Sequence, residues 1–323
     1  MKNQTLLVVA LLLTTAVFSQ QSQYYSDPQE KFKEAKEYFQ KEQYSLAYPL
    51  LKELQQSVRE TDKANYPVTV QEINYYTTAC ALKQNESRAE EKAIDYIKLE
   101  KNTPRVQMMS FHLGEYYFRK KDFAKAAEQF EQTNIANLSN KEIAEMKFQQ
   151  GYSYFTLQKF AQAKPLFNTI RTMKDDPNYL DANYYYGFLS FRDREYGPAL
   201  ESFKIVENEK DYATVVPYYI AQIYYIQGKK EEALSECRRA VELLPVEKDA
   251  FNGPLMIQWS AISAGWVGEK DLAIEQLSMA VRVPGPLTYG NLKLQPFWDP
   301  LRGDPRFEQI VNSLAPKGAE VTH

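Results

Sequence analysis

The sequence predicts an all-α fold of about seven helical hairpins with a capping helix towards the C-terminus. Pairs of small residues recur twelve positions apart along most of the chain. Glycine is scarce, at 12 of 323 residues, and no stretch alternates between apolar and polar residues with the period of a strand. Tyr and Phe are abundant, at 24 and 17 residues, which gives a helical array large side chains to pack with.

Residues 1–19 have the pattern of a secretory signal peptide. Lys2 is the only charge, and a mostly apolar run follows from Leu6 to Phe18. A run of this length is too short to cross a bilayer, which needs about 20 residues, and fits the apolar region of a signal peptide. We expect cleavage before Gln20 and export to the periplasm or envelope, without a lipid anchor because no Cys lies at the junction. The alternative is an uncleaved apolar N-terminal helix.

Residues 20–283 are predicted to form the array of hairpins. A small residue on each first helix lets the second helix approach closely, and a small residue on the second helix does the same from the other side. A large residue usually follows the second small residue by four positions. The seven pairs are Ala35/Ala47, Ala81/Ala93, Gly114/Ala126, Gly151/Ala163, Gly187/Ala199, Ala221/Ala233 and Ala261/Ala273.

Residues 284–316 are predicted to cap the array, and residues 317–323 form a short tail. Pro284 and Gly285 end the last hairpin. Asp304 is a good N-cap residue with Pro305 at the first helical position. The helix after it has an apolar face of Phe307, Ile310, Val311 and Leu314. A separate recognition role for this segment is the alternative to capping.

The repeated pattern resembles that of tetratricopeptide-repeat (TPR) proteins, whose units have about 34 residues. The third unit carries it most clearly, with Leu113-Gly114, Tyr117, Ala126 and Phe130. The first two units are degenerate, and the family's Trp near the start of each unit is absent. Residues 20–228 resemble exported TPR proteins of Bacteroidetes, and residues 231–316 resemble the C-terminal TPR segment of bacterial multidomain regulators. The resemblance implies a right-handed superhelical solenoid.

Few residues offer catalytic or metal-binding chemistry. The chain has 2 His and 2 Cys, and it lacks the glycine-rich phosphate-binding motifs. His112 is interpreted as a packing or surface residue. Cys80 and Cys237 lie four units apart in the predicted array, so we expect two unpaired, buried thiols. The sequence therefore predicts no enzyme activity, no cofactor and no metal.

In the TPR family the first helices line a concave surface, and the corresponding positions here are mostly aromatic. This implied groove has two arginines beside the rings and lacks the charges of a carboxylate clamp. The alternative interpretation is that the rings pack between neighbouring hairpins. The groove residues are Phe111, Phe118, Arg119, Phe148, Tyr152, Phe155, Tyr184, Phe188, Phe191, Arg192, Tyr218 and Tyr225, with Phe32 and Phe39 at the same positions of the first unit.

The function predicted from the sequence is a non-catalytic scaffold that takes a protein or peptide partner into this groove. A ligand-sensing or glycan-binding envelope module is the alternative, because aromatic grooves also stack sugars. Basic and acidic residues number 39 and 42, so the net charge is −3, which argues against nucleic acid as a partner. No membrane span is expected, and an envelope-associated complex is a possible setting.

Overall fold

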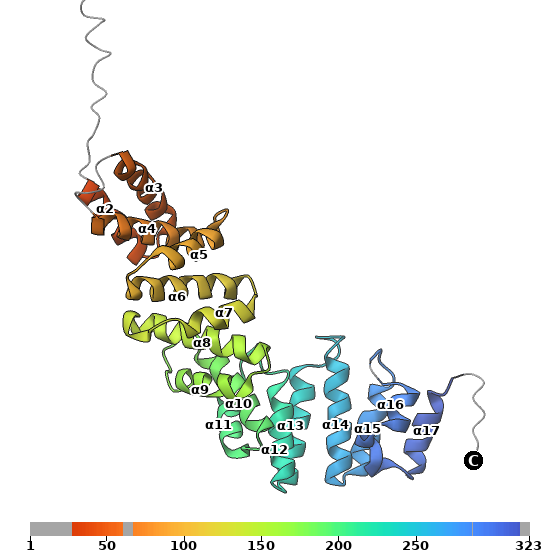
Figure 1. Ribbon diagram of the computed structural model, residues 1–323. Coiled ribbons are helices and arrows are strands. Elements are labelled where there is room, and N and C mark those ends of the chain that lie inside the picture. The colour runs from red at the N-terminus through yellow and green to blue at the C-terminus, as the bar shows by residue number, and fades with distance from the viewer. Residues whose placement is uncertain (1–27, 61–66, 286, 317–323) are drawn as a thin grey trace, which may run out of the picture. The chain divides into compact units, whose positions relative to one another are not determined.

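The computed structural model describes residues 28–60, 67–285 and 287–316, and all regular secondary structure in these ranges is helical (Figure 1). The predicted all-α class is confirmed. The signal-peptide prediction, the Gln20 junction and the tail lie outside the described residues. Within the described ranges no helix is both long and apolar enough to cross a membrane.

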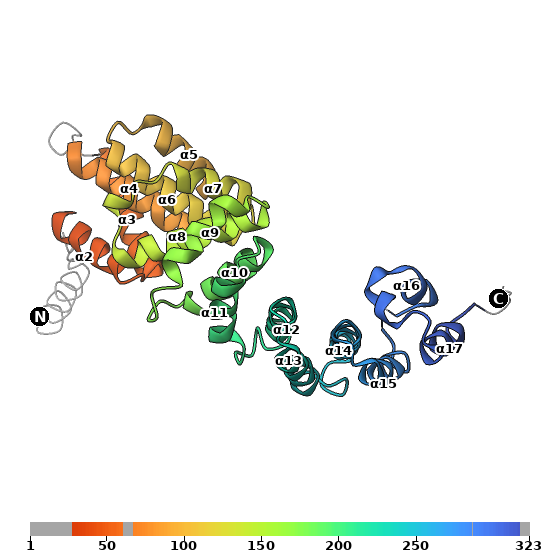
Figure 2. The same cartoon turned by 90° about the horizontal axis from the view of Figure 1, so that it is seen from below.

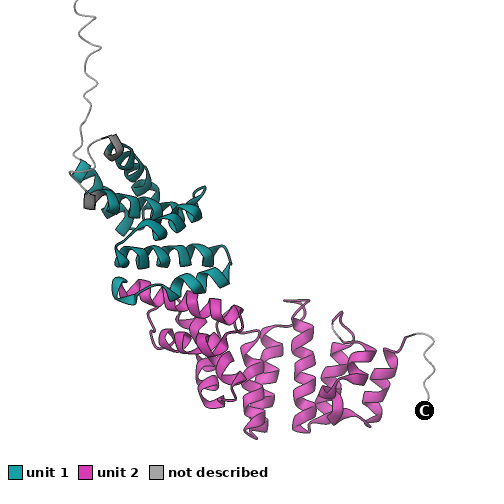
Figure 3. Cartoon of the chain, viewed as in Figure 1, with its two compact units in different colours: residues 1–138 teal, residues 139–323 magenta. Residues whose placement is uncertain are grey.

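In the described ranges the helices pair into seven hairpins, each packed from two helices adjacent in sequence. They fall into two compact units, residues 1–138 and 139–323 (Figure 3). Unit 1 holds α2 (Pro28–Gln40) with α3 (Tyr44–Glu60), α4 (Pro67–Lys83) with α5 (Ala89–Leu99), and α6 (Thr103–Arg119) with α7 (Phe123–Glu131). The short 3-10 helix η1 (Ile135–Asn137) ends it.

Unit 2 holds the other four hairpins and the C-terminal segment. The hairpins are α8 (Asn140–Thr156) with α9 (Phe160–Ile170), α10 (Tyr179–Arg192) with α11 (Tyr196–Val206), α12 (Val216–Ile226) with α13 (Lys230–Leu243), and α14 (Gly253–Val267) with α15 (Lys270–Ala280). The C-terminal segment is α16 (Tyr289–Leu294), the 3-10 helix η2 (Pro296–Leu301) and α17 (Pro305–Ser313). Figure 2 shows α12 to α15 nearly end-on, with the two helices of each hairpin side by side.

The predicted small-residue pairs lie inside the hairpins, and all fourteen members are buried. Glycine is used where a ring lies closest. A Cβ added at Gly114 would lie 2.7 Å from the ring of Phe130, and one added at Gly187 would lie 2.9 Å from the ring of Phe203. The ring four positions after the second small residue therefore fills the space beside the glycine, which is the first small residue of the pair.

Six of the seven first helices end in the same way. The residue seven positions after the first small residue has a positive φ, and a backbone bond closes the turn around it. At Gln158, with φ 59°, the N–H of Lys159 donates to the carbonyl of Tyr154 at 2.8 Å. This is a Schellman-type helix end. In the second hairpin the corresponding turn comes earlier, at Asn85, and α4 ends only two residues after Ala81. Arg88, seven positions after Ala81, also has a positive φ, but it is the N-cap residue of α5.

Tyrosines on two first helices join neighbouring hairpins of unit 2. Tyr185 stacks on Phe167 of the preceding hairpin, with ring centroids 5.1 Å apart. Tyr219 stacks on Phe203 in the same way, at 5.2 Å and nearly parallel. Each stacked phenylalanine covers the glycine of its own hairpin, so glycine, phenylalanine and tyrosine form a repeated three-layer contact.

The C-terminal segment packs onto the last hairpin. Trp298 is fully buried with Phe307 and Val311, and Ile310 and Leu314 pack against the same cluster, as the apolar pattern predicted. The Asp304 side chain accepts a hydrogen bond from the backbone N–H of Arg306 and caps α17. The neighbouring Phe297 remains 44% exposed.

Candidate functional site: an aromatic surface on unit 2

The groove residues predicted in unit 1 differ in exposure. Phe111 is buried at 1% exposure, with the ammonium of Lys83 5.9 Å from its ring centroid. Phe118 is half-buried and lies edge-on to Phe123, with centroids 5.8 Å apart. Arg119 is exposed and donates to the carbonyl oxygen of Leu82 at 2.8 Å. Phe111 thus belongs to the interior of the unit, and Phe118 and Arg119 lie at its surface.

In α8 and α10 of unit 2, the predicted rings contact one another across hairpins. Phe155 lies 5.6 Å from Phe188 and 4.9 Å from Tyr185, measured between centroids. Phe148 is buried, and Tyr152 packs edge-on to Tyr185 at 5.4 Å. These contacts are the packing that the alternative interpretation expected.

The remaining predicted residues of α10 have partners of their own. Tyr184 stacks on Tyr212 at 4.5 Å, and Phe191 lies 5.3 Å from Tyr219. The exposed guanidinium of Arg192 lies 4.4 Å above the ring centroid of Phe160.

A ring pair at the hairpin turn explains which groove rings are covered. In four hairpins the ring four positions after the first small residue lies edge-on to an aromatic residue five positions further on. The pairs are Phe39/Tyr44, Phe118/Phe123, Phe155/Phe160 and Phe191/Tyr196, with centroids 5.3–5.9 Å apart. In the sixth hairpin the second position is Lys230, and the ring of Tyr225 is 39% exposed.

The aromatic residues at the C-terminal end of unit 2 form a more open surface. Tyr218 of α12 lies 4.6 Å from Trp259 of α14, and Trp259 lies 6.2 Å from Phe297 of η2. The indole N–H of Trp266 donates to the carbonyl oxygen of Phe297 at 3.0 Å, while its ring is 46% exposed. We call Tyr218, Tyr225, Trp259, Trp266 and Phe297 the aromatic surface.

Sequence reasoning identified only the two tyrosines of this surface. Trp259 lies two positions before Ala261, and Trp266 lies five positions after it. Both were missed because these are not the groove positions assigned from the family. Tyr185 and Tyr219 were missed for the same reason, although both lie two positions before the small residue of their hairpins. That repeated position is a signal that the sequence contains.

The hydroxyl of Tyr218 is held neutral. Burial raises its pKa to about 12, and Tyr219 and Cys237 add to the effect. At neutral pH the aromatic surface therefore offers uncharged rings and a phenol. Such rings anchor apolar side chains of a partner and accept cations over their faces.

The cysteines are buried and unpaired, as expected. Burial raises the pKa of Cys80 to about 12 and that of Cys237 to about 11, so both remain thiols at neutral pH. Over the described ranges, no group of three or more His, Cys, Asp and Glu residues is placed to hold a metal ion.

His112 is a packing residue, as interpreted from the sequence. It is 2% exposed, and its Nε2 lies 2.9 Å from the hydroxyl of Tyr75. Its Nδ1 lies 3.3 Å from the Glu115 carboxylate, which also accepts from Lys83 at 2.6 Å.

Comparison with known proteins agrees with the repeated hairpins. Residues 87–136, which include α5, α6 and α7, match the family model of the tetratricopeptide repeat. No curated protein matches the sequence. The match covers the third hairpin and the second helix of the hairpin before it, and the other described hairpins repeat the same twelve-residue spacing of small residues.

Solved structures resemble part of the chain. A crystal structure of MamA aligns over 57% of this chain and 92% of its own, with 16% identity and a TM-score of 0.45. YrrB, a TPR protein with an unusual peptide-binding site, aligns over 54% of this chain and 86% of its own, with 18% identity and a TM-score of 0.43.

Proposed function

We propose that this chain is a non-catalytic scaffold that binds a protein or peptide segment on the aromatic surface of unit 2. The observation that carries the proposal is the run of half-exposed rings from α12 across α14 to η2. Large aromatic residues dominate the energetics of protein interfaces, where a few anchors supply most of the affinity. A segment with apolar side chains fits this surface, because the five residues carry no charge.

The proposed setting is the periplasm or envelope. It is supported by the signal-peptide pattern of residues 1–19, with Gln20 as the first residue of the exported form. N-terminal sequencing of the exported protein tests this part, and an intact Met1 in the membrane fraction would contradict it.

A peptide library displayed to the immobilised full chain tests the binding proposal. We expect selected peptides to share an apolar pattern, and calorimetry to give a dissociation constant for one of them. Trp266→Ala and Tyr225→Ala should each weaken that affinity by at least about tenfold, since interface anchors cost 2 kcal/mol or more when truncated.

Phe251→Ala is the matched control, because Phe251 is an aromatic residue of unit 2 that is 79% exposed and not part of the surface. It should leave the affinity unchanged. Unchanged affinity for both Trp266→Ala and Tyr225→Ala would show that the peptide binds elsewhere.

A further inference from the structure

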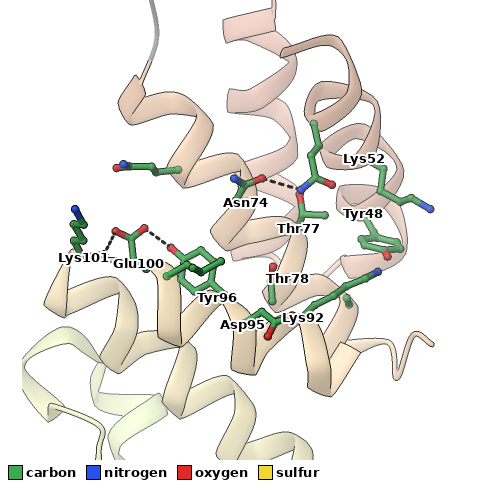
Figure 4. A pocket seen from close by; sticks show the side chains of 14 residues that line it. Tyr48, Lys52, Asn74, Thr77, Thr78, Lys92, Asp95, Tyr96, Glu100 and Lys101 are labelled. Atoms are coloured by element: carbon green, nitrogen blue, oxygen red, sulfur yellow. Dashed lines mark hydrogen bonds between the residues drawn. The ribbon is translucent and has the colours of Figure 1, made fainter. Parts of the chain in front are cut away.

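Unit 1 contains a cavity of about 660 Å³ between α3, α4 and α5, separate from the aromatic surface (Figure 4). This volume is in the range of small-molecule sites in proteins. Most of its lining side chains are polar. They come from three helices of two adjacent hairpins of the same unit and from Glu100 and Lys101, which follow α5.

The residue at one position of the repeat explains why space remains beside α4. Three positions before the first small residue, the hairpins one and three to six carry the aromatic residues Phe32, Phe111, Phe148, Tyr184 and Tyr218. The second hairpin carries Thr78 at this position, and Thr78 lines the cavity. A threonine fills much less volume than a ring, so α4 leaves unfilled the space that a larger side chain would occupy.

Two hydroxyl groups at the cavity are available to a ligand. Thr78 is 9% exposed and Tyr48 is 7% exposed, and both side chains line the cavity. Each hydroxyl can both donate and accept a hydrogen bond, so the two together suit a polar occupant of the cavity. Beside them the amide of Gln55 donates to Asn74 Oδ1 at 2.8 Å, which orients both amides in the cavity wall.

The charges at the cavity favour an anion. Among the acidic lining residues, Glu100 is already occupied. It accepts hydrogen bonds from Arg105 at 3.1 Å, from the Tyr96 hydroxyl at 3.0 Å and from the backbone N–H of Asn102 at 2.8 Å. The remaining charged lining residues are Lys52, Lys92 and Lys101 against Asp95, an excess of positive charge.

We infer that this cavity binds a small acidic saccharide, a sugar that carries a carboxylate. Thr78, Tyr48 and the Gln55–Asn74 amide pair supply the hydroxyl and amide partners that sugar hydroxyls require, and the lysines attract the carboxylate. Ala81, Leu99 and the tyrosine rings are the apolar groups of the lining, and the other ten lining side chains are polar or charged. The inference concerns a different unit from the proposed peptide surface and does not depend on it.

Ligand-observed NMR with the full chain tests the inference. The probes are a disaccharide that contains glucuronate, its neutral glucose counterpart and inorganic phosphate. We expect the acidic disaccharide to bind at least about tenfold more tightly than the neutral one, because hydrogen bonds to charged groups contribute more than neutral ones. Phosphate should not displace it.

Variants of the cavity locate the binding. Thr78→Phe places in the second hairpin the ring that other hairpins have, and it should abolish binding. Thr78→Val, which keeps the shape and removes the hydroxyl, and Lys92→Gln should each weaken binding by about tenfold. Circular dichroism establishes that each variant is folded, and Thr78→Val keeps the test valid should Thr78→Phe fail to fold.

Three outcomes would overturn the inference: no binding of the acidic disaccharide, equal binding of the neutral one, or displacement by phosphate. If the acidic disaccharide does not bind, it is not the ligand of the cavity. If the neutral disaccharide binds equally well, the lysines do not select the carboxylate. If phosphate displaces the acidic disaccharide, the cavity is a simple anion site. Tight binding that survives both Thr78 variants in folded protein would place the ligand elsewhere. None of these results bears on the peptide affinity measured with Trp266→Ala.

Discussion

At the scale of single residues, the fold depends on close contacts between a glycine and a ring. The Phe130 ring lies 2.7 Å from the place where a Cβ of residue 114 would be, and both residues are buried in the third hairpin. Alanine is favoured over glycine inside a helix by propensity, so the choice of glycine here reflects packing. The same reasoning applies to Gly187 and Phe203, but less to Gly151, whose nearest neighbours would lie 3.3 Å from an added Cβ.

We therefore expect Gly114→Ala to destabilise unit 1 by about 1–3 kcal/mol, the usual cost of overpacking a core. Urea unfolding followed by circular dichroism measures this. Gly197→Ala is the control, because position 197 is an exposed helical site with no atom within 4 Å of an added Cβ. It should be neutral or slightly stabilising. Equal effects at both positions would disprove the packing argument.

A second prediction at this scale concerns the stability of the fold at acidic pH. Burial by itself raises the pKa of Glu100, but hydrogen bonds from Arg105, Asn102 and Tyr96 outweigh it and hold the pKa at about 2, below its ordinary 4.5. The ionised form is thus favoured by folding. Its contribution to stability is present above about pH 4.5 and is lost as the pH falls towards 2.

Glu100→Gln should lower the melting temperature at pH 7 and flatten its fall between pH 5 and 2. Thermal unfolding across this pH range measures both effects. Glu128→Gln, at an exposed carboxylate of α7, should change neither. A Glu100→Gln protein with the wild-type acid profile would show that the hydrogen bonds around Glu100 do not stabilise its ionised form.

At the scale of helices and hairpins, the ring pair at the turn divides the predicted groove residues into two kinds. Phe155 contacts Phe160, Tyr185 and Phe188, so it joins three helices. Tyr225 has Lys230 in place of the second ring and is 39% exposed. The same position of the repeat is thus a packing site in one hairpin and an accessible ring in another.

Phe155→Ala should destabilise unit 2 by about 2–4 kcal/mol, near the range for a truncated core phenylalanine. Tyr225→Ala should cost less than about 0.5 kcal/mol, as surface substitutions do. Thermal unfolding of these two variants measures the difference. Phe191→Ala is compared with them, because Phe191 has a ring partner at the turn as Phe155 has. A loss at Tyr225 as large as that at Phe155 would mean that the ring pair does not determine burial.

The hairpins were predictable because their signal repeats: a pair of small residues twelve positions apart recurs in each of seven units and is visible in one sequence. The exposure of each ring was not, because it depends on a residue five positions away and on the helix of the next hairpin. The cavity beside Thr78 was also not predictable, since an unfilled volume leaves no residue pattern of its own. The three helices around it had to be placed first.

At the scale of the whole molecule, repeats contact mainly their sequence neighbours, so a local change should remain local. The described chain forms two compact units, and the C-terminal segment belongs to the second. Trp298 is its largest fully buried side chain. It is fully buried among Leu292, Leu301 and Phe307, and its indole N–H donates to Asn291 Oδ1 at 3.2 Å.

Trp298→Ala should therefore cost about 3–5 kcal/mol in the stability of the C-terminal segment and the last hairpin. Hydrogen exchange resolved by mass spectrometry should show protection lost in α14 to α17 and retained in α2 to α7, because local opening follows local contacts. Phe251→Ala is the control, since that ring is 79% exposed, and it should leave exchange nearly unchanged throughout. A Trp298→Ala protein that loses protection equally in both units would show that the chain unfolds as one cooperative body, and that a lost contact is not confined to neighbouring hairpins.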